Sequence, residues 1–256
     1  MDFRQSDYIY SYDGSFDGLL CCLFTMYTLK EIPAAVEKSY GGFLPVRNVG
    51  TDEEKAKRVH KGIYKAAGER ALYYGETAYL SEREGVEKNI LLYFVLCLEK
   101  GSVADRLVGE PCVAAVHDAS RYTANERHRI IQFLRFSDSG GVLTSVITPK
   151  ANVLPLLAGH FIARFPRERF LIYDAARGMA LVCEKGKKGI VALEEYEQPA
   201  PDETEQRYRD LFCTFYETIA IKERRNERLR MQHMPKRFWV NMTEFLNRSY
   251  DTPPDE

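Results

Sequence analysis

The chain has 256 residues, a net charge of −1 at pH 7, 45% hydrophobic residues and 29% charged residues. This composition is typical of a globular protein of one or two domains, and a nearly neutral chain lacks a global field that would attract nucleic acid or anionic lipid. The longest apolar run, Ile90–Leu98, is too short to span a bilayer, and the polar, acidic start does not resemble a signal peptide. We therefore expect a cytoplasmic protein without membrane contact.

The stretch Asp13–Leu20 joins a short predicted strand to a predicted helix. Its glycines, Gly14 and Gly18, permit a sharp bend, and Asp17 is expected to cap the helix. The helix N-terminus could also receive an anion such as a phosphate. Asp13, Gly14 and Asp17 are therefore a candidate turn or anion site, and the turn is the favoured interpretation because aspartates at such positions usually hydrogen-bond their own backbone.

Helical patterns dominate the rest of the first half. Thr51, with Glu54 three residues later, predicts a capping box at the start of a helix. Further helical patterns follow in residues 82–100 and, with an interruption near Pro111, in residues 106–136. The first half of the chain is therefore expected to be helical.

The pattern changes after Gly140–Gly141, which predicts a turn. Residues 142–149 read as a strand, and residues 152–165 as a helix capped by Asn152. Three short β-like runs follow, and the "GKKG" of residues 186–189 is expected to be a hairpin turn. The predicted fold class is α+β, with a helical first half, a small antiparallel sheet and further C-terminal helices.

An acidic, proline-containing linker is predicted at Glu194–Glu205. A helix should follow from about Thr204, with an apolar stripe made of Tyr208, Phe212, Phe215 and Ile219. The predicted organisation is a main α+β domain of residues 1–198 and a C-terminal helical segment, residues 199–256, that packs on it.

The C-terminal segment contains the strongest nucleic-acid signal in the sequence. From Lys222 to Arg237 there are seven Lys or Arg against two Glu, and Phe238 and Trp239, the single tryptophan, follow at once. Lysine and arginine neutralise phosphates, and an exposed aromatic ring can stack on a base. The alternative is a solvated helical face, with Trp239 packed on the body of the protein.

A second polar stripe is predicted near the middle of the chain. Arg121, Asn125, His128, Gln132 and Arg135 fall at helical spacing on one face. Downstream, His160 and Arg164 lie one helical turn apart, and Asp174 and Arg177 follow a predicted strand. Arginines suit phosphate or carboxylate recognition, and a histidine between arginines could act as a neutral base. Asp174 could instead pair with an arginine and hold a corner of the fold together.

Several kinds of chemistry are not supported by the sequence. The six cysteines show no C-x-x-C spacing, and the five histidines form no H-x-x-x-H pair, so neither a metal site nor a bound cofactor is expected. Nucleophile-elbow, phosphate-loop and dinucleotide-binding motifs are also missing. An enzyme would have to use His128 or His160 as a base, together with Asp13, Asp17 or Asp174.

Three stretches carry a family resemblance: "YDGSFDGLL" near the start, "ERHRIIQFLRF" with the following "GVLTSVITPKANVLPLLAGHFIARFPRERFLIYDAARG", and "MPKRFWVNMTEF" near the end. With these, the chain resembles a bacterial family of unknown function labelled probable DNA metabolism protein. The resemblance implies a radical-SAM iron–sulfur partner, and in other members the same domain is joined to a uracil-DNA-glycosylase-like domain.

The sequence and the resemblance together suggest an accessory protein of DNA repair or modification that contacts DNA. The expected contacts form one polar groove with a basic edge, made of Arg121, His128, Arg129, Arg135, His160, Arg164, Arg177, Lys236, Arg237 and Trp239. Two alternatives stay open: a nucleic-acid hydrolase or lyase with a His/Asp site, and a protein-docking module that does not contact DNA.

Overall fold

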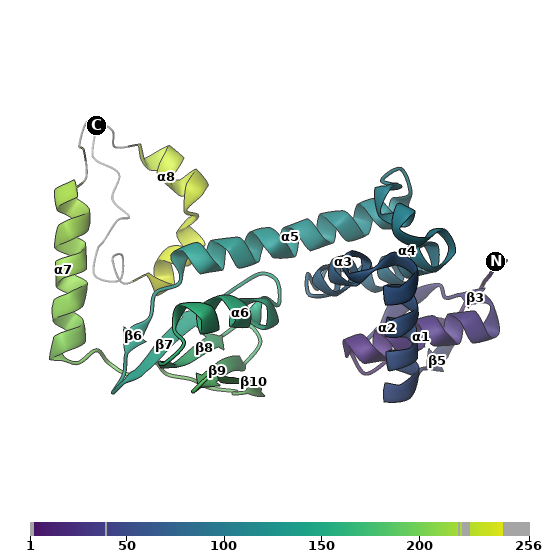
Figure 1. The fold of residues 1–256 in the computed structure, drawn as a ribbon, viewed down its shortest axis with the longest axis horizontal. Helices are drawn as coiled ribbons and strands as arrows, with labels where there is room; N and C mark the ends of the chain where they lie inside the picture. Colours follow the sequence, from purple (N-terminus) through teal and green to yellow (C-terminus); the bar gives the residue numbers. More distant parts are fainter. Residues whose placement is uncertain (1–2, 39, 220, 222–225, 243–256) are drawn as a thin grey trace. The chain divides into compact units, whose positions relative to one another are not determined.

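A computed structural model describes residues 3–38, 40–219, 221 and 226–242 (Figure 1). Contacts divide the chain into two compact units, residues 1–125 and residues 126–256, which we call unit 1 and unit 2 and describe separately. Both units combine helices with strands, so the α+β class is confirmed at this level. The layout within each unit differs from the prediction, as follows.

Unit 1 contains small parallel sheets, of which the sequence predicted only the central strand. The central strand β2 (Ile9–Ser11) pairs in parallel with β4 (Ala35–Glu37) on one side and with β5 (Val46–Asn48) on the other. A second parallel pair joins β1 (Arg4–Gln5) to β3 (Glu31–Ile32). The first half is mainly helical, as expected, and the strand predicted before Asp13 is β2, but its pairing with β4 and β5 was not predicted, because strands of two or three residues are too short to produce a clear alternating pattern.

The helices of unit 1 are α1 (Phe16–Leu29), α2 (Glu53–Ala67), α3 (Glu69–Tyr79), α4 (Val86–Lys100), the 3₁₀ helix η1 (Gly101–Arg106) and α5 (Pro111–Phe133), which continues into unit 2. Their core contains fully buried Leu23, Ile63 and Phe94. Gly75 on α3 lies against the Phe94 ring so closely that a Cβ would collide with it, which explains a glycine inside this helix. The predicted helices thus pack together.

The caps of the first two helices differ from the predicted ones by one or two residues. Ser15, not Asp17, caps α1: its hydroxyl accepts a hydrogen bond from Gly18 N at 2.9 Å. Asp52, not Thr51, caps α2, because its carboxylate accepts hydrogen bonds from the backbone N–H groups of residues 54 and 55. Ser, Thr and Asp are all good caps, so adjacent candidates cannot be separated by residue type.

Unit 2 is built around a five-stranded sheet, with the order β10-β9-β8-β7-β6. The strands are β6 (Ser137–Asp138), β7 (Val142–Ile147), β8 (Arg169–Asp174), β9 (Met179–Glu184) and β10 (Lys187–Ala192). The sheet is mixed rather than antiparallel, because β7 and β8 are parallel while the other pairs are antiparallel. Helix α6 (Leu154–Arg164) causes this difference, since it connects β7 to β8 as a crossover.

Helix α6 packs on the sheet through an aromatic cluster. Phe161 is buried, and its ring lies 5.4 Å from Phe136 and 6.4 Å from Phe170 of β8. Val153 occupies the cap position of α6 without a side-chain hydrogen bond, so Asn152 is not the cap. The hairpin turn between β9 and β10 lies at Lys185–Gly186, one residue earlier than the predicted "GKKG".

The chain after the sheet forms α7 (Glu203–Ile219), α8 (Glu227–His233) and the 3₁₀ helix η3 (Lys236–Asn241). The predicted linker has no helix or strand from residue 193 to residue 202, and the predicted start of the next helix is confirmed. Phe238 of η3 is buried, with its ring 5.3 Å from Phe133 of α5, so this part of the C-terminal segment packs on unit 2.

Candidate nucleic-acid interface

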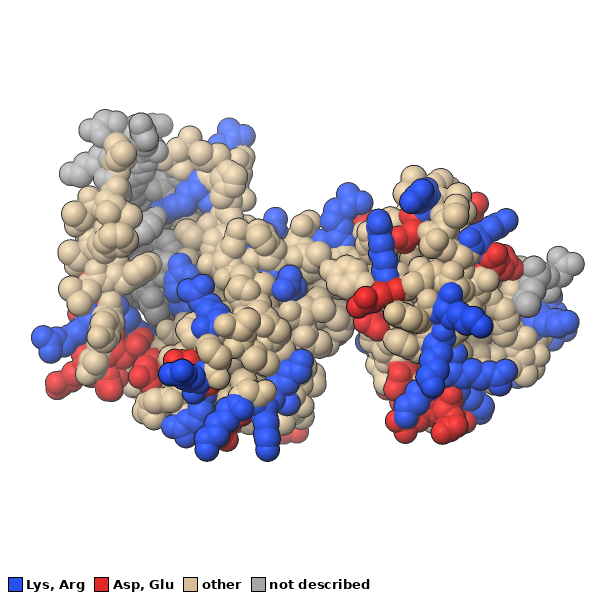
Figure 2. Space-filling model, viewed as in Figure 1, with Lys and Arg blue, Asp and Glu red and all other residues tan. Residues whose placement is uncertain are grey.

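Basic side chains gather at one end of the five-stranded sheet, over β9 and β10 in Figure 2. The strand register places the start of β8 beside the start of β7, with Arg169 opposite Val142, and places Phe170 opposite Cys183 of β9. The β9–β10 turn and the chain that enters β8 therefore share this end of the sheet. We call it the basic sheet end and define it by Arg164, Arg167, Arg169, Lys185, Lys187 and Lys188.

A tight turn presents three of these residues. Lys185 and Gly186 both have positive φ angles, 50° and 77°, which is the backbone of a two-residue type I′ hairpin turn. Gly186 adopts this conformation without strain, and the turn directs the chain straight back into β10. Lys185, Lys187 and Lys188 consequently lie together at the tip of an exposed hairpin.

The charge of residues 126–192, which include α6 and the five-stranded sheet, favours the binding of anions. Residues 126–192 include eleven Lys or Arg and five Asp or Glu, a surplus of six positive charges in a chain that is nearly neutral. Glu126 and Asp174 are buried, which leaves Asp138, Glu168 and Glu184 as the exposed carboxylates. Within the described residues, no ion pair neutralises any of the six basic side chains of the basic sheet end, and all six are exposed.

Two of the predicted site residues lie on α6. Arg164, in its last turn, is exposed and belongs to the basic sheet end. His160, one turn earlier, is half-buried and meets the Phe161 ring edge-on at 5.0 Å. The prediction that these two side chains follow one another along a helix is confirmed, and Arg164 is near basic residues that the sequence did not single out.

Asp174 and Arg177 lie at the opposite end of the sheet. β8 begins at Arg169 and ends at Asp174, so about 17 Å separates the two ends at roughly 3.3 Å per residue. Asp174 is fully buried, and Arg177 Nη1 donates to its Oδ2 at 2.9 Å and to the Pro149 carbonyl at 3.2 Å. Burial raises the pKa of the Asp174 carboxyl, although Arg177 opposes this effect. The pair holds a corner of the fold, as the alternative interpretation proposed.

Glu126 and Arg237 form a second buried pair near that corner. Arg237 donates from both terminal nitrogens to the two Glu126 carboxylate oxygens, at 2.6 Å to Oε1, and Lys150 N donates to Oε1 at 2.9 Å. Burial alone would raise the pKa of Glu126, but these hydrogen bonds outweigh it and the pKa is lowered. Arg237, predicted to contact phosphate, is instead engaged in joining η3 to α5.

The predicted residues Arg121, His128 and Arg129 of α5 are exposed, Arg135 just after α5 is partly exposed, and none of the four contacts Asp174 in the described structure. His128 Nε2 is 2.9 Å from Gln132 Nε2, one turn along the helix, and Arg129 is exposed. Arg135 donates to the carbonyls of residues 132 and 134 and lies 5.9 Å from the Phe212 ring. Arg121 is exposed and belongs to unit 1. In the described chain, no hydrogen bond joins His128, His160 and Asp174 to one another.

Trp239, predicted to stack on a base, already has contacts within the C-terminal segment. Trp239 Nε1 donates to the Met234 carbonyl at 3.0 Å, and the cationic groups of Arg230 and Lys236 lie 4.7 and 5.9 Å from its ring. Lys236 is exposed. Residues 222–225, which contribute much of the predicted basic run, lie outside the described residues.

In unit 1, the candidate turn or anion site is arranged as a turn. Asp13 Oδ1 accepts hydrogen bonds from Ser15 N at 2.9 Å and from the Ser15 hydroxyl at 2.7 Å, and Gly14 has a φ of 79°. Burial acts to raise the pKa of Asp13, but hydrogen bonds from Ser15 and Thr51 lower it overall. Asp17 lies in the first turn of α1. The aspartates therefore serve local structure here.

A polar cluster around the Asp105 carboxylate was not predicted from the sequence. The carboxylate accepts a hydrogen bond from the Tyr93 hydroxyl at 2.7 Å, pairs with Arg70 Nε at 2.9 Å and lies 3.3 Å from His117 Nε2. The Tyr74 ring packs 4.4 Å from the His117 ring. These residues come from three helices and η1, so spacing along the chain gives no signal for the cluster. The three polar contacts all end on the Asp105 carboxylate, so the cluster connects the helices of unit 1 and has a structural role.

A cavity of about 350 Å³ lies beside α1, β5 and the start of α2. Arg47 and Lys55 are the cations at its wall, and each is already close to a carboxylate: Arg47 lies 3.2 Å from Glu31 and Lys55 lies 3.0 Å from Asp52. The cavity therefore has less positive charge than its residue types suggest. The basic sheet end, whose basic side chains have no ion-pair partner among the described residues, is the stronger candidate for an anionic partner.

The described residues contain neither a group of side chains that could hold a metal ion nor a helix that could cross a membrane. No group of three or more His, Cys, Asp or Glu is arranged to hold a metal ion among residues 3–242, masked positions aside. No described helix combines the length and the apolar character needed to cross a bilayer.

Comparisons with known proteins give one match. The profile of a domain of unknown function, DUF4130, matches residues 84–244. The match includes the second of the three resemblance stretches and nearly all of the third, whereas the first lies outside it. No curated protein and no solved structure matches the chain.

Proposed function

We propose a function for this chain, which belongs to the DUF4130 family of domains of unknown function, from its own surface chemistry. It is an accessory protein of DNA repair or modification that contacts DNA through the basic sheet end of unit 2. The observation that carries this proposal is the group of six exposed basic side chains, from α6, β8 and the β9–β10 hairpin, without ion-pair partners among the described residues. Such groups attract phosphate backbones by releasing counterions.

The shape of the basic sheet end supports phosphate contacts rather than base recognition. Lys185, Lys187 and Lys188 belong to a hairpin, Arg169 begins the neighbouring strand β8, and Arg167 lies in the connection just before it. Lysines act as mobile point charges, while arginine forks can hold a phosphate with two hydrogen bonds. The surface is therefore suited to a nucleic-acid backbone without a strong sequence preference.

The proposed context of DNA repair, and the proposed radical-SAM iron–sulfur partner, rest on the resemblance to the DNA metabolism family alone. Both agree with a chain that lacks recognisable catalytic motifs of its own and has no metal-binding group in its described part. An accessory role requires that the chain bind DNA and a partner protein. The basic sheet end is suited to DNA, and exposed apolar side chains elsewhere on the chain are suited to a protein.

Fluorescence anisotropy with labelled single-stranded and duplex DNA tests the DNA contact. We expect Lys187→Ala/Lys188→Ala to weaken binding at low salt by about tenfold, since each lost phosphate contact removes a counterion-release contribution. Lys61→Ala/Lys65→Ala is the matched control: it removes two exposed lysines from α2 in unit 1. Equal losses in both variants, or no binding by the wild type at low salt, would overturn the proposal.

A further inference from the structure

Helix α7 presents a row of large apolar side chains to solvent. Tyr208, Leu211, Phe212, Phe215 and Ile219 are exposed by 68%, 65%, 39%, 57% and 57%. Their spacing of three or four residues places them on one face of the helix. We call this face the α7 stripe. Single exposed apolar residues need no explanation, but a continuous row of them usually marks a surface that another protein or segment covers.

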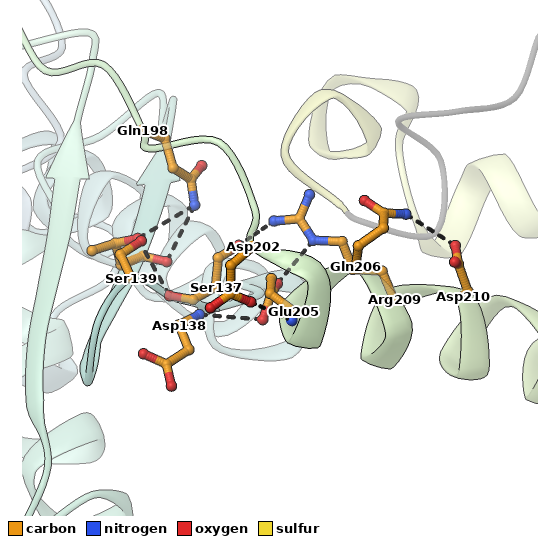
Figure 3. Close-up of polar contacts among 10 residues, drawn as sticks. Ser137, Asp138, Ser139, Gln198, Asp202, Glu205, Gln206, Arg209 and Asp210 are labelled. Carbon is orange, nitrogen blue, oxygen red and sulfur yellow. Dashed lines mark hydrogen bonds and ion pairs between the residues drawn. The ribbon is translucent and has the colours of Figure 1, made fainter.

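Polar contacts fix the first turns of α7 to the sheet (Figure 3). Arg209 donates to the Ser137 hydroxyl at 2.6 Å and to Glu205 Oε1 at 2.8 Å, and Asp138 N donates to Glu205 Oε2 at 3.3 Å. Gln198, in the chain that leads into α7, donates to the Thr144 carbonyl. Arg209 lies beside the α7 stripe rather than within it, and Phe212, the least exposed member of the stripe, also lies 5.9 Å from the Arg135 guanidinium. The helix is therefore anchored while its apolar face stays outward.

The order of residues in the α7 stripe is self-complementary. If a second, identical helix runs in the opposite direction, Tyr208 of one copy meets Ile219 of the other, and Phe212 meets Phe215, so four of the five side chains find an apolar partner within the stripe. A twofold axis between the helices produces each contact twice. A parallel pair would instead bring the acidic first turns, with Glu203, side by side and align the two helix dipoles.

The area of the α7 stripe is sufficient for a reversible dimer. Side chains of this size bury about 150 to 250 Å² each when fully covered. At the fractional exposures given above, the five side chains expose about 550 Å² in each copy, so complete coverage would bury about 1,100 Å² in the pair. Stable interfaces begin at about 1,200 Å², so the stripe and its flanking residues lie at the lower limit.

From these observations we infer that a second copy of this chain covers the α7 stripe, through an antiparallel pair of α7 helices. The interface is independent of the basic sheet end and does not require DNA. Because its area is small, the dimer should dissociate at micromolar concentration rather than persist at nanomolar concentration.

Sedimentation equilibrium without DNA, from about 1 to about 100 µM protein, tests the dimer. We expect a monomer–dimer equilibrium for the wild type and at least a tenfold weaker dimer for Phe215→Glu, because a charge at the centre of the interface loses its hydration. Tyr64→Glu, a similarly exposed position on α2, is the control and should dimerise like the wild type. Far-UV circular dichroism confirms that each variant keeps its helices.

A charge-pair rescue tests the direction of the helices. Tyr208→Lys and Ile219→Glu should each weaken the dimer when studied alone. Mixed together, they should form a heterodimer, because one contact becomes Lys–Glu and the other stays Tyr–Ile. A wild type that stays monomeric at about 100 µM, a Phe215→Glu variant that dimerises normally, or a mixture without rescue would overturn the antiparallel pairing.

Discussion

Glu126 and Asp174 show how burial shapes the charge of a surface. Both carboxylates belong to the body of unit 2, yet each is buried and paired with an arginine, Arg237 or Arg177. These pairs remove two negative charges from the surface and also two of the arginines expected to contact phosphate. Most of the exposed positive charge of residues 126–192 therefore comes from the basic sheet end, with Arg129 and Lys150 exposed elsewhere.

Glu126 should contribute to stability in a pH-dependent manner. Its pKa is lowered in the folded state, so its contribution is complete above its unfolded pKa, about 4.3, and is lost as the pH falls through the lower folded value. Glu126→Gln should reduce the free energy of unfolding at pH 7 by about 3 kcal/mol, because the buried Arg237 contact is broken. Urea unfolding at several pH values measures this difference.

The difference in unfolding free energy between wild type and Glu126→Gln should shrink as the pH is lowered from 5 towards 3. Glu168→Gln, which changes an exposed carboxylate of the same unit, is the control and should differ little from wild type throughout. A difference for Glu126→Gln that stays constant over this pH range would contradict the assigned ion pair.

The cysteines should differ sharply in reactivity. Cys21, Cys22, Cys97 and Cys183 are buried, while Cys112 and Cys213 are partly exposed. Burial raises the pKa of the Cys22 thiol to about 12 and that of Cys97 to about 12, which leaves almost no thiolate at pH 8. A thiol-reactive reagent should modify at most Cys112 and Cys213 rapidly in the native protein. Rapid modification of Cys22 or Cys97, located by peptide mass spectrometry, would contradict their placement in the buried core.

At the scale of elements, local signals identified helices better than their exact starts. Most of the helices between Glu53 and Phe133, and the start of α7, were predictable from apolar spacing. The predicted caps of α1 and α2 were displaced because neighbouring Ser, Thr and Asp residues all favour cap positions, whereas α6 begins after Val153 without a side-chain cap. Parallel pairing of β7 with β8 was not predictable, since an apolar run does not reveal the direction of its partner strand.

The cap of α1 can be tested by two adjacent substitutions. Ser15→Ala should lower the free energy of unfolding by about 1 kcal/mol, because the hydroxyl accepts from Gly18 N and also donates to Asp13. Asp17→Ala should cost less, about 0.5 kcal/mol, since it removes only a favourable charge from the first turn. Thermal or urea unfolding compares the two. A larger loss of unfolding free energy for Asp17→Ala than for Ser15→Ala would indicate that Asp17, not Ser15, caps α1.

At the scale of the whole chain, the candidate site could be predicted only in part. The sequence identified Arg164 and the exposed faces of α5 and α6, but it grouped Arg164 with Arg177, which lies at the other end of β8. Lys187 and Lys188 were predicted only as part of a hairpin turn, and Lys185 was not singled out. Strand register brings the hairpin to the start of β8, and register depends on pairing between distant residues, which single-sequence patterns do not contain.

The central claim, that the basic sheet end contacts the phosphate backbone, is tested most directly by the salt dependence of DNA binding. On duplex DNA, each phosphate contact contributes about 0.9 to the slope of log affinity against log salt. We predict that Lys187→Ala/Lys188→Ala has a slope shallower than the wild type by about 1 to 2, while Lys61→Ala/Lys65→Ala keeps the wild-type slope. Identical slopes for the wild type and Lys187→Ala/Lys188→Ala would show that DNA, if bound, is held elsewhere.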